Sequence, residues 1–104
     1  MSVSRVLSLA CLALLACAGA ASARDKIIGV SWANLTAAHW QMDEAALRRA
    51  VELAGDKLIS RDAQGSPDRQ IATINDLISE GANALIIHPV DPGALAPALA
   101  AART

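Results

Sequence analysis

The sequence predicts an α/β fold in which a parallel sheet lies between two layers of helices. Short apolar segments rich in β-branched residues alternate with longer segments in which apolar residues recur at helical spacing. Glycine and helix-capping residues separate these segments. The alternation repeats about three times, and strands that alternate with helices form parallel sheets through right-handed crossovers.

The N-terminal segment, residues 1–23, predicts a cleavable secretory signal peptide. Arg5 provides a positive charge, the run after it is almost wholly apolar, and Ala21 and Ala23 form an A-x-A cleavage site. The apolar run is shorter than the ~20 residues that span a bilayer. We therefore expect an exported, periplasmic protein that begins at Arg24 and has no direct membrane insertion after signal cleavage.

Two other interpretations of this segment stay open. The apolar run also fits the first helix of a cytoplasmic domain, although such a helix would show a polar face. Leu14-Leu15-Ala16-Cys17 resembles a lipoprotein box, in which Cys17 would be lipidated and would anchor the protein to the membrane. Cleavage after Ala23 leaves a chain without cysteine, which excludes disulfides and thiol catalysis.

The predicted mature chain, residues 24–104, has 81 residues (104 − 23), enough for one small domain. Removal of Arg5 leaves eight basic residues (9 − 1) against ten acidic ones, a formal net charge of −2 (8 − 10). The charges are interspersed, so the composition favours neither nucleic acid nor an anionic membrane surface as a partner.

The first strand–helix unit covers residues 26–54. Residues 26–32 form a short apolar run typical of a strand that is buried on both faces. Thr36 then predicts the N-cap of a helix over residues 37–54, and Gly55 fits its C-terminus. The apolar stripe of this helix consists of Trp40, Leu47, Val51 and Ala54.

The second unit covers residues 57–81. A weaker strand candidate at residues 57–62 is followed by a turn and then by Ser66-Pro67, a strong helix start with serine as the N-cap and proline in the first turn. The apolar stripe of this helix consists of Ile71, Ile74, Leu77 and Ile78. Gly81 ends the helix.

The third unit begins with a strand at residues 84–87. Asp91-Pro92 starts a third helix, residues 94–102, and Pro97 predicts a distorted first turn there. With a strand order of 2-1-3, the order reverses between the first and third strands. Ligands of such sheets bind at that point, beyond the carboxyl ends of the strands. The candidate ligand-binding segments are therefore residues 32–36 and 88–91.

Three segments along the chain are similar to those of one known family. Residues 27–43 contain a strand, a polar loop and the pair His39-Trp40 at the start of a helix. Residues 63–70 form a turn into the second helix, and residues 77–91 contain a helix end, a glycine, a strand and a proline. In this order, the segments resemble periplasmic sugar-binding proteins of ABC transporters, of the xylose- and ribose-binding type.

The resemblance implies a bilobed protein with Rossmann-like, three-layer lobes, a ligand-binding fold shared with lactose-repressor-like regulators. Such a protein closes on a monosaccharide and delivers it to the membrane permease of an ABC transporter. Family members are considerably longer, so residues 24–104 are expected to be a partial, truncated N-terminal lobe that ends before the fourth strand. Ala33, Asn34 and Thr36 stand where xylose-type members carry two carboxylates and an arginine, so the resemblance does not indicate which sugar is bound.

Six residues are candidate sugar contacts, namely Trp32, Asn34, Thr36, His39, Trp40 and His88. Amide and hydroxyl side chains both donate and accept hydrogen bonds, and tryptophan offers a flat face with a polar N–H. Histidine can bind a hydroxyl without a permanent charge. Some of these residues also have a structural interpretation: Asn34 as a turn residue, Trp40 as a core residue of the helical stripe, and His39 as a solvated residue of the first turn.

The sequence contains no catalytic or cofactor motif. It lacks the H-x-x-x-H and H-E-x-x-H metal spacings, a G-x-S-x-G nucleophile turn and a glycine-rich phosphate loop after the first strand. We therefore predict a binding protein and not an enzyme, with no metal and no cofactor. A periplasmic sensing module that presents sugar to a histidine kinase or chemoreceptor would contain the same lobe and is an alternative, as is a truncated reading frame without function.

Overall fold

The computed structural model describes residues 25–104 and contains one parallel sheet of three strands. The strands are β1 (Ile27–Trp32), β2 (Lys57–Asp62) and β3 (Ala84–Ile87), and β1 lies in the middle in the order β2-β1-β3. The predicted α/β fold and strand order are confirmed. The predicted signal peptide and its alternatives fall on residues outside the described range.

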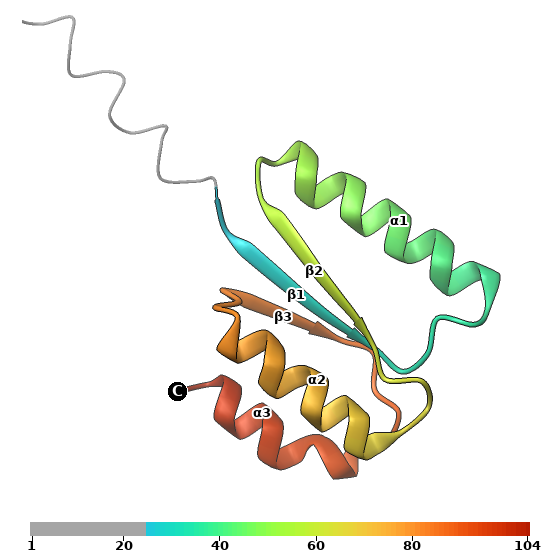
Figure 1. Ribbon diagram of the computed structural model, residues 1–104, viewed down its shortest axis with the longest axis vertical. Helices are drawn as coiled ribbons and strands as arrows, with labels where there is room; N and C mark the ends of the chain where they lie inside the picture. Colours follow the sequence, from blue (N-terminus) through green and yellow to red (C-terminus); the bar gives the residue numbers. More distant parts are fainter. Residues whose placement is uncertain (1–24) are drawn as a thin grey trace, which may run out of the picture.

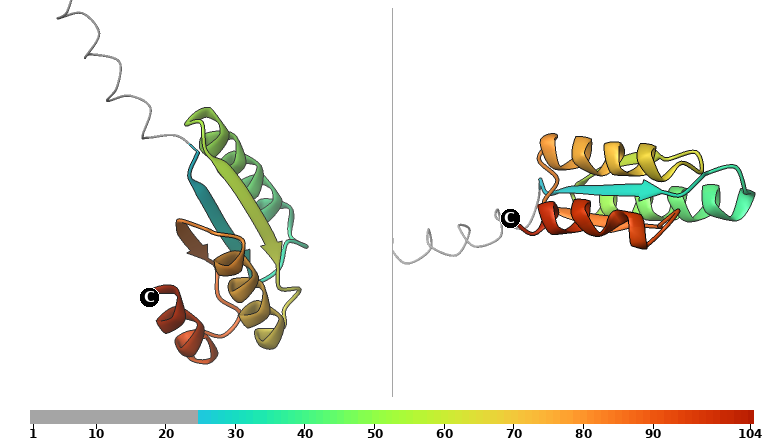
Figure 2. Two further views of the ribbon diagram at one scale, coloured as in Figure 1. Left: turned by 60° about the vertical axis from the view of Figure 1, so that its left-hand side comes forward. Right: turned by 90° about the horizontal axis from the view of Figure 1, so that it is seen from below.

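Helices flank the sheet on two sides. In Figure 1, α1 (Ala38–Leu53) lies on one side, and α2 (Pro67–Ser79) and α3 (Ala96–Ala102) lie next to each other on the other. Figure 2 shows from below that β1 passes between α1 and α2. Right-handed crossovers explain this arrangement. The chain crosses the sheet in one direction from β1 to β2 and in the opposite direction from β2 to β3, so the two connecting helices lie on opposite faces.

The sheet face that packs against α1 is apolar. Val30 and Trp32 of β1 and Leu58 of β2 form a buried cluster with Val51 of α1. Half-buried residues extend this cluster, namely Ile28, Leu35, Trp40 and Leu47. Ala54 was predicted to belong to the apolar stripe, and this prediction is wrong. It is exposed, because α1 ends one residue earlier and the chain turns there.

The other face of the sheet is covered by α2. Ile74 and Leu77 are fully buried, and Ile74 packs with Leu95 and Ala98 from the third helical segment. Gly29 of β1 allows α2 to approach closely, since a Cβ atom at this position would lie 3.1 Å from Leu77 Cδ2. The predicted core role of Ile74 and Leu77 is confirmed.

The helix starts show which local predictions hold. Ser66 caps α2 as predicted, and its Oγ accepts a hydrogen bond of 3.2 Å from the Arg69 N–H. Thr36 does not cap α1, because the N-cap residue is Ala37, which makes no side-chain hydrogen bond. The Thr36 hydroxyl instead donates to Asn34 Oδ1 at 2.9 Å, so it is engaged in the loop before the helix.

The third helical segment starts with a 3₁₀ turn (η2, Gly93–Leu95) and continues as α3. Asp91 Oδ1 accepts a hydrogen bond of 2.9 Å from the Gly93 N–H at the start of this turn. Pro97 lies in the first turn of α3, so the predicted distortion takes the form of a change in helix type just before it. Within residues 25–104, no helix has the length and apolar character needed to cross a membrane.

Candidate ligand-binding site

The carboxyl ends of the three strands meet at one edge of the sheet, which is the edge predicted for a ligand (Figure 1). There the His88 N–H donates to the Ser31 carbonyl at 2.9 Å, so the loop after β3 stays beside β1. The loop after β1 leads into the first turn of α1 at the same edge. Side chains from β1, from the start of α1 and from the end of β3 therefore come together.

Four rings form a continuous group at this edge, the aromatic cluster, which consists of Trp32, His39, Trp40 and His88. The ring centroids of Trp40 and His88 lie 4.2 Å apart, and those of His39 and Trp40 lie 4.4 Å apart. The Trp32 centroid is 6.3 Å from that of Trp40 and 6.4 Å from that of His88. All of these ring pairs are tilted. The two pairs that include Trp32 lie within the range of about 4.5–7 Å that aromatic pairs prefer, and the two histidine–Trp40 pairs are slightly closer.

The members of the aromatic cluster differ in exposure. Trp32 is 6% exposed, and its Nε1–H donates to Ser60 Oγ at 3.1 Å, so it forms the floor of the cluster. His39 is exposed, whereas Trp40 and His88 are half-buried. The surface that the cluster offers to a ligand therefore comes mainly from Trp40 and the two histidines.

His88 has a buried ring nitrogen, Nδ1, without a hydrogen-bond partner among residues 25–104. Buried polar atoms in folded proteins are nearly always paired, so an unpaired one marks a place that a water or a ligand group fits. The ring that carries this atom lies against Trp40. This nitrogen is covered by the surrounding residues, so a water or a ligand group would reach it only if the cluster opened.

Asn34 and Thr36 bond to each other in the loop after β1. Asn34 Oδ1 accepts from the Thr36 N–H at 3.3 Å and from its hydroxyl at 2.9 Å. This arrangement agrees with the structural interpretation of Asn34, in which the side chain stabilises its own turn. Both of these bonds engage the Asn34 oxygen, and neither involves its Nδ2 group.

A buried polar network of Ser31, Gln70 and Thr73 lies on the opposite face of β1 and was not predicted from the sequence. Ser31 Oγ and Thr73 Oγ1 lie 2.8 Å apart, and the Gln70 side chain reaches both Ser31 and the loop after β3. Gln70 and Thr73 each precede an apolar residue of the predicted stripe. Apolar spacing alone therefore misplaced the stripe slightly, since Ile71 is half-buried whereas Gln70 is fully buried.

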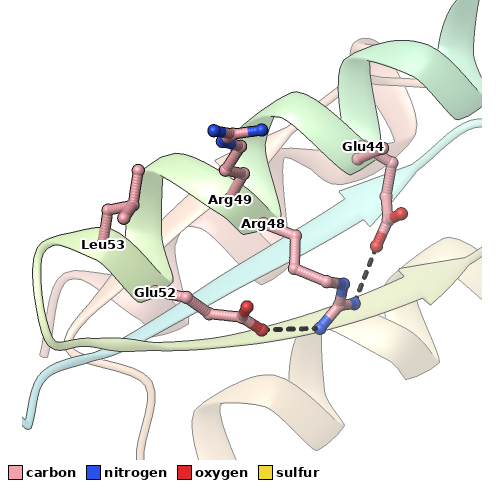
Figure 3. Close-up of a pocket in the computed structure, with 6 residues that line it drawn as sticks. Glu44, Arg48, Arg49, Glu52 and Leu53 are labelled. Atoms are coloured by element: carbon pink, nitrogen blue, oxygen red, sulfur yellow. Dashed lines mark hydrogen bonds and ion pairs between the residues drawn. The ribbon is translucent and has the colours of Figure 1, made fainter.

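Two grooves lie away from the aromatic cluster. One, of about 400 Å³, runs along the outer side of α1, where Figure 3 shows Arg48 between two glutamates. Arg48 lies 2.7 Å from Glu44 Oε1 and 3.9 Å from Glu52 Oε1, as is common for paired charges on a solvated helix face. The other groove, of about 310 Å³, follows β3 between α2 and α3. No group of three or more metal-binding side chains is found in the part of the chain that the structure describes.

Residues 28–104 match the model of a known family, the periplasmic binding protein domain. The chain belongs to this family. One curated relative of the periplasmic binding protein family is the D-xylose-binding periplasmic protein of Escherichia coli (strain K12), 29% identical over 86% of this chain. Another is the ribose import binding protein RbsB of Bacillus subtilis (strain 168), 27% identical over 97% of this chain.

A solved structure of an ABC transporter solute-binding protein from Mycobacterium smegmatis, with bound glycerol, resembles this periplasmic binding protein domain with a TM-score of 0.73. It is 35% identical over 76% of this chain. The resemblance to the xylose- and ribose-binding type is thus confirmed, and the family consists of binding proteins and not of enzymes. The chain spans 27% and 36% of the length of the two curated relatives and 27% of the solved structure.

Proposed function

We propose that residues 24–104 form part of the N-terminal lobe of an exported solute-binding protein, and that this lobe supplies one wall of a site for a small sugar. In this proposal the signal peptide is removed after Ala23 and the protein works in the periplasm. The sugar is passed to the membrane permease of an ABC transporter. The names of two relatives, which refer to D-xylose binding and ribose import, support a sugar as the ligand.

The aromatic cluster at the carboxyl ends of β1 and β3 is the observation that carries the proposal. Ligand sites combine apolar and aromatic surface with a few well-placed polar groups, and this edge offers both. Trp40 provides a ring face for the C–H side of a sugar, and His39 and His88 provide ring nitrogens that exchange hydrogen bonds with hydroxyls. None of the six candidate residues has a permanent charge, which suits a neutral sugar better than a sugar phosphate.

Trp32, Asn34 and Thr36 have supporting roles in this proposal. Trp32 is almost fully buried and its ring pairs with those of Trp40 and His88, so it supports these two rings and offers little surface of its own to a ligand. The turn formed by Asn34 and Thr36 leaves the Asn34 Nδ2 group to donate to a sugar oxygen. These assignments make Trp40, His39 and His88 the main contacts and the other three residues the rim and the floor of the wall.

One wall alone is expected to bind sugars weakly. Each neutral hydrogen bond contributes about 0.5–1.5 kcal/mol net, and tight binding requires burial of most of the ligand in a cleft. A few such bonds and one ring face would supply roughly 2–4 kcal/mol, which corresponds to a dissociation constant of about 1 mM or weaker. The 104-residue chain by itself should therefore respond to sugars only at high concentration.

Two-dimensional NMR of the isotope-labelled mature chain tests the proposal with ribose, xylose, arabinose, galactose and glucose. At millimolar and higher concentrations, at least one of these sugars should shift the Trp40 indole and His88 ring resonances in a saturable way. Trp40→Ala should abolish the response. Met42→Ala is the matched control, because Met42 lies on the same helix and is 72% exposed.

Two results would contradict the proposal. If none of the five sugars causes a saturable shift in the wild-type chain, the aromatic cluster is not a sugar site. If calorimetry finds a dissociation constant in the micromolar range or below, the single-wall description fails, because such affinity needs a complete cleft.

A further inference from the structure

We infer that Gln70 is a positioning residue for the site: its buried carboxamide holds the loop after β3 so that the His88 ring stays against Trp40. The inference rests on the proposed function, in which His88 is a sugar contact. Gln70 itself lies on α2, on the other face of the sheet from the aromatic cluster, and would reach the sugar only through His88.

The Gln70 carboxamide is fully buried and is bonded at both ends. Its Oε1 accepts from the Val90 N–H at 2.8 Å, and its Nε2 donates to the His88 carbonyl at 2.9 Å. Nε2 also lies 3.3 Å from Ser31 Oγ and 3.5 Å from the Ser31 carbonyl. A flipped amide would place its oxygen against two carbonyl oxygens, so the contacts define the orientation of the group.

These contacts hold the backbone of His88 from two sides. Its N–H donates to the Ser31 carbonyl of β1, and its carbonyl accepts from Gln70 of α2. Because Gln70 also holds the Val90 N–H, the loop is tied to α2 at two points. The backbone position of His88 limits where its ring can lie, and the ring centroid is 4.2 Å from that of Trp40.

Thr73 in the same network offers a matched control. Its Oγ1 lies 2.8 Å from Ser31 Oγ and 2.8 Å from the Gln70 backbone carbonyl, and among the described residues it makes no hydrogen bond to the loop after β3. Gln70→Met removes the carboxamide and keeps the length of the side chain. Thr73→Val removes the hydroxyl and keeps the shape. Both variants weaken the buried polar network, but only Gln70→Met releases the loop that carries His88.

NMR of the free mature chain provides the test. In the wild type, the Trp40 ring should displace the His88 ring-proton resonances, and the Val90 amide should exchange slowly with solvent. Gln70→Met should move the His88 resonances toward random-coil values. It should also accelerate exchange of the Val90 amide about two- to tenfold, the factor expected from loss of one hydrogen bond. Thr73→Val should leave both readouts unchanged although it lowers stability.

A sugar titration then links the position of His88 to binding. With a sugar that shifts the wild-type spectrum, Gln70→Met should weaken binding about two- to tenfold relative to Thr73→Val. Unchanged His88 resonances in folded Gln70→Met, or equal displacement in both variants, would overturn the inference.

The inference can be tested even if Gln70→Met fails to fold. In that case, the exchange rate of the Val90 amide in the wild type is the test, because this amide donates to Gln70 Oε1. Exchange as fast as in a solvent-exposed loop would overturn the inference, and slow exchange would support it. A wild-type chain that responds to no sugar would contradict the proposed function alone, since the ring shifts and amide exchange do not depend on a ligand.

Discussion

Replacement of Ile74 by alanine should destabilise the domain strongly, because Ile74 is fully buried where α2 packs against the third helical segment. The substitution removes three buried carbon atoms, which costs about 2.4 kcal/mol of transfer free energy at ~0.8 kcal/mol per carbon group. The cavity left behind adds to this loss, and such substitutions cost about 2–5 kcal/mol in total. Since Leu77 and Leu95 are also fully buried and leave little room to relax, we expect a loss of about 3–4 kcal/mol.

This loss is large relative to the stability of the whole domain. Domains are stable by about 0.05–0.15 kcal/mol per residue, or roughly 4–12 kcal/mol for the 80 residues (104 − 24) that the structure describes. Urea unfolding followed by far-UV circular dichroism should therefore show a much lower midpoint for Ile74→Ala, with an unchanged m-value.

The neighbouring residue Asn75 provides the control, because it is exposed on the same helix. Asn75→Ala should change the free energy of unfolding by less than about 0.5 kcal/mol, as is usual for surface substitutions. A loss of less than about 0.5 kcal/mol for Ile74→Ala would refute the reasoning, since a fully buried isoleucine cannot be truncated at so small a cost.

Three further predictions concern a helix cap, a close contact and the N-terminus. Ser66→Ala should lower the free energy of unfolding by about 1 kcal/mol in the same urea assay, because α2 loses its N-cap, and an unchanged midpoint would contradict this role. Gly29→Val should destabilise by about 1–3 kcal/mol, since the added Cβ atom alone would lie 3.0 Å from Leu85 Cδ2; wild-type stability would show that the side chains can move apart. N-terminal sequencing of the exported protein should find Arg24 first, whereas a lipidated species that begins at Cys17 would contradict the predicted cleavage.

Local chemistry predicted most of the fold. Ser66-Pro67 correctly marked the start of α2, and the glycines after α1 and α2 adopt left-handed conformations, with φ of 85° at Gly55 and 87° at Gly81. These signals depend on groups only a few residues apart, so they can be recognised before any tertiary contact is known. The alternation of strands and helices then favoured a parallel sheet over other arrangements.

Thr36 and Ala54 show where the same local reasoning failed. The Thr36 side chain could either cap α1 or bond within the loop before it. In the structure its hydroxyl donates to Asn34 Oδ1, two residues earlier, so it does not cap the helix. Ala54 follows the apolar spacing of α1, but it lies just beyond the end of the helix at Leu53, where the chain turns toward β2. Periodicity predicts which residues face one side and does not predict how far the helix stays in contact with the sheet.

Only the tertiary structure decided which side chains meet at the site and how. The strand order places Trp32 and His88 at the same edge. It does not reveal that Trp32 is almost fully buried, or that a ring nitrogen of His88 has no hydrogen-bond partner among residues 25–104. The burial of Gln70 depends on groups of Ser31 and His88 that lie 39 and 18 residues away along the chain. Apolar spacing reports the hydrophobicity of a face and carries no information about which distant polar groups approach it, so the buried network and the aromatic cluster arise only when the strands lie side by side.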